Sequence, residues 1–411
     1  MKNDLDSLLQ QNDLDALLVV GPGDHNPAMT YFTGGAHITD ALLVKKRGEQ
    51  PLLFSHSMER DEAARSGLQT KIIEEYRFQD LLKEHGGDVQ QATIDLYCKM
   101  LADAGLASGR VALYGITNLG RAYGLFSGLQ KALPEITFVG ELGAPTLLQA
   151  MATKDGAEVE RIRRMGRITT EVVGLTADYL TSHEVREETL IKPDGAPLTV
   201  GDVKARINLW LAERGAENPE GTIFAIGRDA GVPHSAGNPS DVIQLGKTIV
   251  FDIFPTELGG GYFYDFTRTW CLGYAPAEAV EIYEDVLAVF QQIMAELKAG
   301  EPTRAYQERT CELFEARGHP TVRSQPQTQE GYVHSLGHGL GLHVHERPMF
   351  GITATAEDVL APGVVVTIEP GLYYPERGLG VRLEDTIYVH RDGTIETLAE
   401  YPLDLVLPMQ S

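Results

Sequence analysis

Four of the chain's 12 histidines lie between residues 334 and 345. The segment contains His334, His338, His343 and His345, separated by Gly337, Gly339 and Gly341. Because the glycines interrupt any helix, we expect a glycine-rich loop or a strand with tight turns. Imidazole nitrogens bind metal ions and carry protons near neutral pH. A chance cluster of ordinary loop histidines is a poor explanation, so the segment predicts a catalytic or metal-binding site.

Two pairs of acidic residues flank the histidines, each in an apolar stretch. Asp252 and Asp265 precede the segment, and Glu369 and Glu384 follow it. All four lie in strand-like patterns, where carboxylates are disfavoured. Buried ionised carboxylates repel each other and lose hydration, unless one is protonated or a cation lies between them. A structural interpretation competes for the aspartates, with one capping a loop and the other pairing with Arg268.

The formal charge suggests how many cations such a site would hold. Four carboxylates contribute four negative charges, which two divalent cations would balance, and His338 adds a neutral nitrogen. Oxygen ligands with one imidazole suit Mn²⁺, Co²⁺, Fe²⁺ or Zn²⁺. Two adjacent cations that share a water molecule generate hydroxide and polarise a carbonyl, which is the chemistry of a hydrolase.

The surrounding pattern predicts the elements that position these groups. A glycine-rich stretch, Thr256–Gly261, predicts a hairpin that brings both aspartates to one face. Arg382 and Glu384 are two residues apart and therefore share a strand face. We predict strands over 248–254, 261–271, 363–369 and 381–389, and helices over 200–214, 276–298 and 304–317. This is an α+β plan, in which helices cover one face of a sheet.

The first part of the chain alternates strand-like and helix-like segments, which is typical of an α/β domain. We predict helices over 5–12, 88–104 and 119–132, and strands over 14–20, 41–46, 51–54 and 111–114. A polar stretch then precedes a long amphipathic helix, predicted over 158–180. A length of 411 residues favours two domains, which we divide into 1–153 and 154–411.

Composition narrows the range of partners. The net charge of −23 disfavours binding to nucleic acid or to anionic membranes. Three cysteines without close spacing give no disulfide or zinc-finger pattern. The polar, acidic N-terminus is unlike a signal peptide, and no apolar run is long enough to span a bilayer. We therefore expect a cytoplasmic protein that binds neither membrane nor nucleic acid.

Seven motifs occur in an order that resembles the pita-bread metallopeptidases, the family of creatinase, prolidase and aminopeptidase P. They are Pro233-His234-Ser235, Asp252, Asp265-Phe-Thr-Arg268, His334-x-x-x-His338-Gly-x-Gly, His345-Glu346, Glu369-Pro-Gly and Arg382-x-Glu384-Asp. The segment 26–35 is similar to the creatinase/prolidase-type N-terminal domain. The resemblance implies a C-terminal pita-bread catalytic domain after an α/β domain, and a homodimer.

The resemblance also implies a role for each site residue. The metal ligands would be Asp252, Asp265, His338, Glu369 and Glu384. A metal-bridging hydroxide would attack the scissile carbonyl, and Glu369 would move the proton of the water to the leaving nitrogen. His345 would stabilise the tetrahedral intermediate, while His234 and His334 would orient the substrate.

Three positions are less clearly defined by the resemblance. Arg382 and Tyr373 would contact the substrate or support the ligands. His343 has no role in the family pattern, and we interpret it either as a pocket residue or as an ordinary loop histidine. The interval from Asp252 to Asp265 is longer than the family's, and the usual spacing would place Phe254 at the ligand position. We assign Asp252, the only acid on that strand, and place the extra residues in the turn at 257–261.

The expected activity is hydrolysis of Xaa-Pro bonds in dipeptides, with two divalent cations, most plausibly Mn²⁺. The alternatives are an aminopeptidase P that acts on longer Xaa-Pro peptides, and a non-peptide C–N hydrolase or lyase. A dipeptidase needs a cation to bind the carboxylate of the proline. Arg347, Arg377 and Arg382 are the candidates for this contact.

Overall fold

The computed structural model describes residues 4–143, 145–351 and 354–410. The chain divides into two compact units, one of residues up to Met151 with Gly259–Gly261, and one of the remaining residues from Ala152. None of the helices in the described part of the chain combines the length and the apolar character that a membrane crossing requires.

The first unit is built on a mixed sheet of six strands in the order β4-β3-β2-β1-β5-β6. Its strands are β1 (Ala16–Gly21), β2 (Ala41–Lys46), β3 (Leu52–Ser55), β4 (Gln69–Ile72), β5 (Gly109–Gly115) and β6 (Ile136–Val139). Its helices are α1 (Leu5–Gln11), α2 (Pro27–Thr33), α3 (Arg60–Arg65), α4 (Phe78–Glu84), α5 (Val89–Asp103), α6 (Leu119–Ala132) and α7 (Thr146–Met151). The predicted α/β character and the predicted elements are confirmed, and the Asp88 side chain caps α5 by accepting from the backbone of Gln91.

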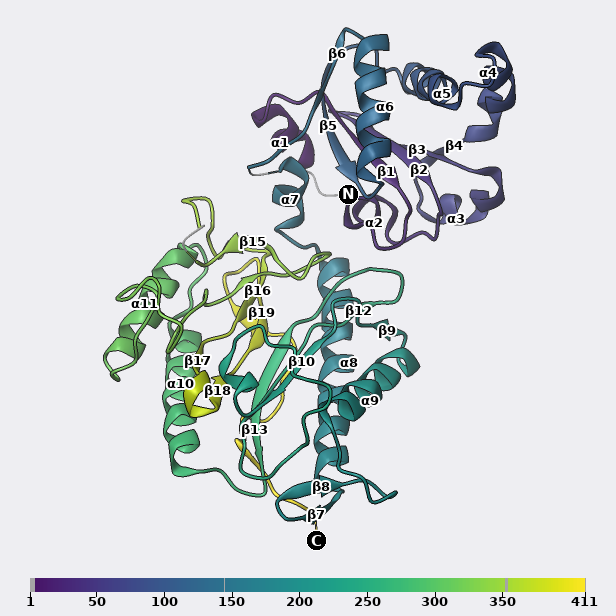
Figure 1. The fold of residues 1–411 in the computed structure, drawn as a ribbon. Coiled ribbons are helices and arrows are strands. Elements are labelled where there is room, and N and C mark those ends of the chain that lie inside the picture. The colour runs from purple at the N-terminus through teal and green to yellow at the C-terminus, as the bar shows by residue number, and fades with distance from the viewer. Residues whose placement is uncertain (1–3, 144, 352–353, 411) are drawn as a thin grey trace. The chain divides into compact units, whose positions relative to one another are not determined.

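The second unit contains two larger sheets, drawn in Figure 1. One has the order β10-β11-β13-β21 and the other β15-β14-β16-β19-β20. The strands of the first are β10 (Thr222–Ile226), β11 (Ile249–Ile253), β13 (Phe266–Leu272) and β21 (Val406–Leu407). Those of the second are β14 (His338–Gly339), β15 (Glu346–Met349), β16 (Val365–Ile368), β19 (Asp385–Val389) and β20 (Ile395–Thr397). Three short pairs complete the unit: β7 (Glu184–Arg186) with β8 (Thr189–Ile191), β9 (Ala216–Glu217) with β12 (Thr256–Glu257), and β17 (Gly371–Tyr374) with β18 (Leu379–Arg382).

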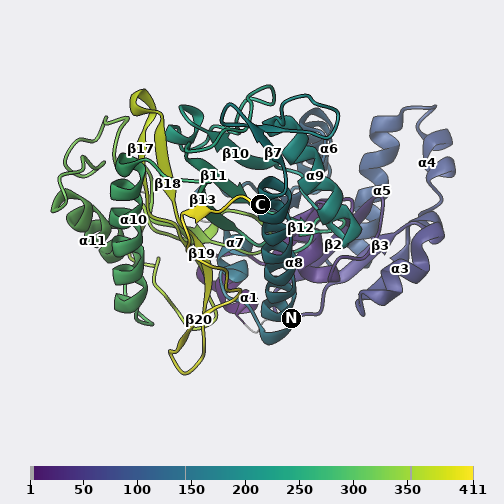
Figure 2. The ribbon, with the colours of Figure 1, turned by 90° about the horizontal axis from the view of Figure 1, so that it is seen from below.

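Helices lie on both sides of these strands, as the two views agree (Figures 1 and 2). They are α8 (Gly156–Thr181) and α9 (Val200–Glu213) on one side, and α10 (Ala277–Glu296) and α11 (Thr303–Glu315) on the other. The sheet that was predicted as one is therefore two sheets in the structure. Each sheet has an apolar face to bury, so each requires its own helical layer. The α+β class itself is confirmed.

The boundaries of three strands differ from the prediction at the acidic residues. Strand β13 begins at Phe266, so Asp265 immediately precedes it. Strand β16 ends at Ile368, one residue before Glu369. The predicted strand 381–389 is divided into β18 and β19, and Glu384 lies in the break between them. Strand interiors disfavour carboxylates, and these three acids accordingly lie just outside regular strand structure.

Candidate metal centre

One cavity of the second unit, of about 400 Å³, is lined by nine of the ten predicted site residues. They are His234, Asp252, Asp265, His334, His338, His345, Glu369, Arg382 and Glu384. The tenth, Tyr373, is completely buried and does not line the cavity. Residues separated by up to 150 positions are thus brought together by the pairing of strands from both sheets.

The two aspartates reach the cavity through the predicted hairpin. Strands β11 and β13 are antiparallel, and Asp252 lies opposite Thr267. Because Asp265 is two residues before Thr267, both aspartates point to the same side of the pair. Residues Thr256 and Glu257, expected in a simple turn, instead pair with β9. The longer interval is thus accommodated beyond the end of β11, and Asp252 keeps its place in the cavity.

Three of the carboxylates that line this cavity each have a buried oxygen with no hydrogen-bond partner among the described residues. They belong to Asp252 (Oδ1), Asp265 (Oδ1) and Glu384 (Oε1). Buried polar atoms are rarely left unpaired, because an unpaired one loses its hydration without compensation. Ligand atoms of Asp265, Glu384 and His338 also lie within 4.8 Å of one another. This donor set fits one or more divalent cations.

His338 is held in the form that a metal ligand needs. Its Nδ1 lies 3.0 Å from the carbonyl oxygen of Gly339, to which it donates, so Nε2 retains its lone pair. Nε2 lies 3.4 Å from Glu369 and 3.6 Å from Asp265. Burial and, to a smaller extent, the nearby His345 lower the pKa of His338 to about 3. The imidazole is therefore neutral at physiological pH.

The carboxylates raise one another's pKa values in the absence of a cation. Burial raises the pKa of Glu369 to about 8. Burial also raises the pKa of Asp265 well above its ordinary value, and the charges of Asp252 and Glu369 add to the effect. Glu384 is shifted upward by burial and then by Asp265. Like charges in an apolar setting cannot all ionise unless positive charge is supplied.

A hydrogen-bonded chain orients the side chains behind the cavity. Arg382 donates to Asp252 at 2.5 Å and to the hydroxyl of Tyr373 at 2.6 Å. His334 contacts the carbonyl oxygen of Ser335 through Nδ1 and the Tyr373 hydroxyl through Nε2, at 2.9 Å. The hydroxyl therefore accepts from Arg382 and donates to Nε2 of His334. Of the two roles predicted for Tyr373, substrate contact or support of the site, these hydrogen bonds favour support, because the hydroxyl contacts two residues that line the cavity.

The remaining histidines divide into two groups. His234 and His345 are exposed and line the cavity, where they can meet a bound molecule. The ring of His345 lies 4.3 Å from that of His338. His343 is not among the residues that line this cavity, and its backbone N–H donates to Glu346. The interpretation of His343 as a loop residue is therefore favoured.

The glycines of the histidine segment are explained by close backbone approach. Strand β14 lies between β15 and β16, and a Cβ atom on Gly339 would lie 2.0 Å from the carbonyl oxygen of Arg347. A Cβ on Gly341 would lie 2.5 Å from the Glu346 carboxylate. Only glycine fits such contacts, so these residues allow His338 and His345 to approach the cavity from a tightly packed strand.

Two features of the site were missed in the sequence. Glu346 forms a fully buried ion pair with Lys154 at 2.6 Å, which anchors the loop carrying His345. Lys204 and Glu220 line the cavity although neither lies in a recognisable motif. Lys204 is on α9, and the helical pattern that predicted α9 could have shown its position but not the cavity that it faces.

The predicted carboxylate-binding arginines are engaged elsewhere. Arg347 pairs with Asp358 at 2.6 Å, and Arg377 pairs with Glu278. Arg382 lines the cavity but is bound to Asp252. Lys204 donates to the carbonyl oxygen of Ala236 and pairs with no carboxylate in the described part of the chain. Among the cations considered, Lys204 is therefore the one that can accept a new anionic partner.

Comparison with known proteins agrees with this geometry. The model of metallopeptidase family M24 matches residues 160–391, more than half of the chain. The chain belongs to this family. Family M24 enzymes are metallopeptidases that depend on divalent metal ions, and the match covers the residues that line the cavity from Lys204 to Glu384.

The M24 chain is similar to proteins that are named Xaa-Pro dipeptidase, dipeptidase and X-Pro aminopeptidase. It is 34% identical over 247 residues to a Xaa-Pro dipeptidase from Pyrococcus furiosus, covering 60% of this chain and 62% of that protein. The structure of a dipeptidase from Pyrococcus horikoshii OT3 matches with a TM-score of 0.75 and 21% identity, over 98% of both chains. The structure of an X-Pro aminopeptidase from Thermotoga maritima matches with a TM-score of 0.73 and 23% identity. The match covers 96% of this chain and 97% of that one. These structures confirm the pita-bread fold.

Proposed function

We propose that this M24 metallopeptidase hydrolyses the Xaa-Pro bond of dipeptides, using two divalent cations held by Asp252, Asp265, His338, Glu369 and Glu384. The observation that carries the proposal is the set of buried carboxylate oxygens without a protein partner around a neutral His338. The Xaa-Pro specificity is supported by the names of two relatives, a Xaa-Pro dipeptidase and an X-Pro aminopeptidase.

The bound cations would lower the pKa of a water molecule and polarise the scissile carbonyl. Glu369 is placed to move protons, because its carboxylate lines the cavity and lies 3.4 Å from Nε2 of His338. It accepts a proton from the attacking water and delivers it to the leaving nitrogen. This protonation is needed for the bond to break, because an unprotonated nitrogen would have to leave as an amide anion.

The other cavity residues bind and orient the peptide. His345 and His234 are exposed to the cavity and can donate to the oxyanion of the tetrahedral intermediate or to the peptide backbone. His334 is held in place by the hydroxyl of Tyr373. Arg382 holds Asp252 at one end of the ligand set.

Preference for dipeptides is supported by Lys204. Its ammonium group can form a charge-assisted hydrogen bond to the terminal carboxylate of a dipeptide, which a longer peptide does not present at that position. An aminopeptidase P would gain nothing from this lysine. The free cation therefore favours the dipeptidase over its alternative.

The proposal is tested by chelating the protein and adding back Mn²⁺, Co²⁺, Zn²⁺ or Fe²⁺ singly, with Ala-Pro and Ala-Pro-Ala as substrates. We expect Mn²⁺ to restore the highest activity and Ala-Pro to be the better substrate. Lys204→Met should raise KM for Ala-Pro about tenfold with little change in kcat. The exposed Lys247→Met serves as the matched control. Equal turnover of both substrates would contradict the dipeptidase assignment, and activity in the chelated protein would contradict the metal mechanism.

The predicted homodimer is part of the same proposal. Light scattering of the purified chain should give twice the mass of 45.0 kDa. A mass of one chain at micromolar concentration would contradict it.

A further inference from the structure

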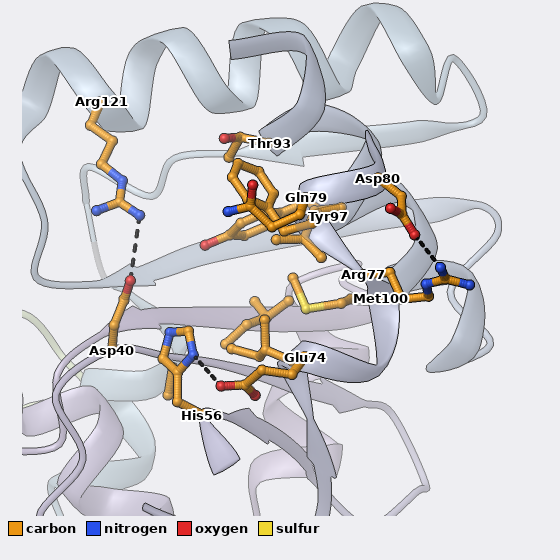
Figure 3. A pocket seen from close by; sticks show the side chains of 15 residues that line it. Asp40, His56, Glu74, Arg77, Gln79, Asp80, Thr93, Tyr97, Met100 and Arg121 are labelled. Carbon is orange, nitrogen blue, oxygen red and sulfur yellow. Dashed lines mark hydrogen bonds and ion pairs between the residues drawn. The ribbon is translucent and has the colours of Figure 1, made fainter. Parts of the chain in front are cut away.

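A second cavity, of about 620 Å³, lies in the first unit and is shown in Figure 3. All of its lining residues fall between positions 40 and 121, so this unit forms it alone. Its apolar wall is made by Leu42, Ile73, Phe78, Leu96 and Met100. The catalytic steps proposed above use none of these residues.

Tyr97 provides an unpartnered polar group in this wall. The residue is 8% exposed, lies on α5 and lines the cavity. Its hydroxyl forms no hydrogen bond within the described ranges. A tyrosine hydroxyl can both donate and accept a hydrogen bond, so this group is available to a molecule bound in the cavity. Burial raises the pKa of Tyr97 to about 12, with a further increase from the charge of Asp40 and a decrease from that of Arg121 included, so the hydroxyl is protonated and can donate.

Charged side chains surround Tyr97 at the edges of the cavity. Arg121 and Asp40 form a pair of 3.4 Å at one side in Figure 3, and His56 and Glu74 form a pair of 3.3 Å below. The Arg121 pair is long and its side chains are 60% and 42% exposed. Such a pair contributes little to stability, so Arg121 can exchange Asp40 for an incoming carboxylate at small cost.

We propose that this cavity binds a short zwitterionic peptide with apolar side chains. The carboxylate would pair with Arg121 and accept from the hydroxyl of Tyr97, and the ammonium group would pair with Glu74. The side chains would cover the apolar wall at Leu42 and Met100. The volume is in the range of pockets for small ligands, about 300–1,000 Å³, and opposite charges across an apolar wall match a molecule with two charged ends.

The test uses hydrogen–deuterium exchange of the full chain with Leu-Leu as the probe. Chelated protein is used, so that the peptide is not consumed. We expect slower exchange in α4 and α5 on addition of Leu-Leu. Arg121→Gln and Tyr97→Phe should each raise the Leu-Leu concentration needed for half-maximal protection about tenfold or more. Arg60→Gln, an exposed residue that does not line the cavity, should leave it unchanged.

Capped probes test the assignment of the two ends. N-acetyl-Leu-Leu lacks the ammonium group and Leu-Leu amide lacks the carboxylate, and both should bind at least tenfold more weakly than Leu-Leu. Absence of protection at millimolar Leu-Leu, or protection that persists unchanged in both cavity variants, would overturn the proposal. So would equal binding of either capped peptide. Because the chelated protein is used, none of these results depends on the catalytic proposal.

Discussion

Two groups of buried acids in the second unit differ in how their charge is compensated. Glu346 is paired with Lys154, and the side chains are 0% and 1% exposed. Asp385 is paired with Arg268, which also donates to four backbone carbonyl oxygens. At the metal centre, by contrast, Asp265 and Glu384 each keep a buried oxygen without a partner. A buried charge with its partners in place is structural, whereas one that lacks them indicates a ligand.

The same comparison resolves an alternative left open by the sequence. Arg268 was a possible partner for Asp265, which would have made that aspartate structural. In the structure Arg268 pairs with Asp385 at 2.8 Å instead. Asp265 therefore remains available, and its carboxylate faces Asp252, Glu384 and His338.

The largest expected effect comes from neutralising one unpartnered acid. Asp265→Asn should lower kcat/KM about 10³-fold, because a lost cation removes several kcal/mol of transition-state stabilisation. Metal content measured by mass spectrometry should fall with it. The thermal midpoint of the chelated protein should not fall, since the substitution removes like-charge repulsion. The exposed Asp61→Asn is the control. A large loss of stability in the chelated Asp265→Asn protein would place Asp265 with the structural acids.

Breaking the paired acid should instead affect stability. Lys154→Met leaves Glu346 buried and uncompensated, and should lower the free energy of unfolding by about 3 kcal/mol or more in urea titration. The double variant Lys154→Met/Glu346→Gln should recover most of the lost free energy of unfolding, because it has no unpaired buried charge at this position. A cost below about 1 kcal/mol for the single variant would show that this pair is not the structural counterpart of the metal centre.

A smaller effect should follow from removing the hydroxyl that orients His334. Tyr373→Phe should lower kcat about 10–100-fold while metal content is retained, as expected for a residue that supports the site. Tyr374→Phe is a matched control, because the neighbouring hydroxyl contacts His319 instead. Equal losses in the two variants would assign Tyr373 only a general packing role.

The smallest expected effect is the pH dependence of stability in the chelated protein. The folded-state pKa of Glu369 is about 8 against an ordinary value of 4.5, so between these values the folded state binds more protons than the unfolded state. Stability therefore falls as pH rises through this window. Calorimetry at pH 5 and pH 8 should show a lower midpoint at pH 8, and saturating Mn²⁺ should remove the difference. A higher midpoint at pH 8 without metal would contradict the repulsion on which the comparison depends.

Local sequence patterns predicted most of the elements and the site residues, for identifiable reasons. The amphipathic spacing over 158–180 predicted a long helix, and the structure has α8 there. Its start is fixed by a capping box of Asp155 and Glu158, which the sequence analysis did not identify. The chemistry-bearing residues were visible because carboxylates and clustered histidines are unexpected in apolar strands. Clear local signals of this kind need no knowledge of distant contacts.

Only the tertiary structure decided which partner each charged group meets. Nothing local distinguishes Arg347, which binds Asp358, from Lys204, which keeps its ammonium group free of any carboxylate in the described ranges. Nor does the sequence show that Tyr373 acts through His334, or that Lys154 neutralises Glu346 across 192 positions. Residue types and their periodicity determine what chemistry a chain can perform and which segments become helices or strands. Charge compensation depends on distances of a few ångströms between remote segments, because electrostatic and hydrogen-bond energies fall steeply with separation.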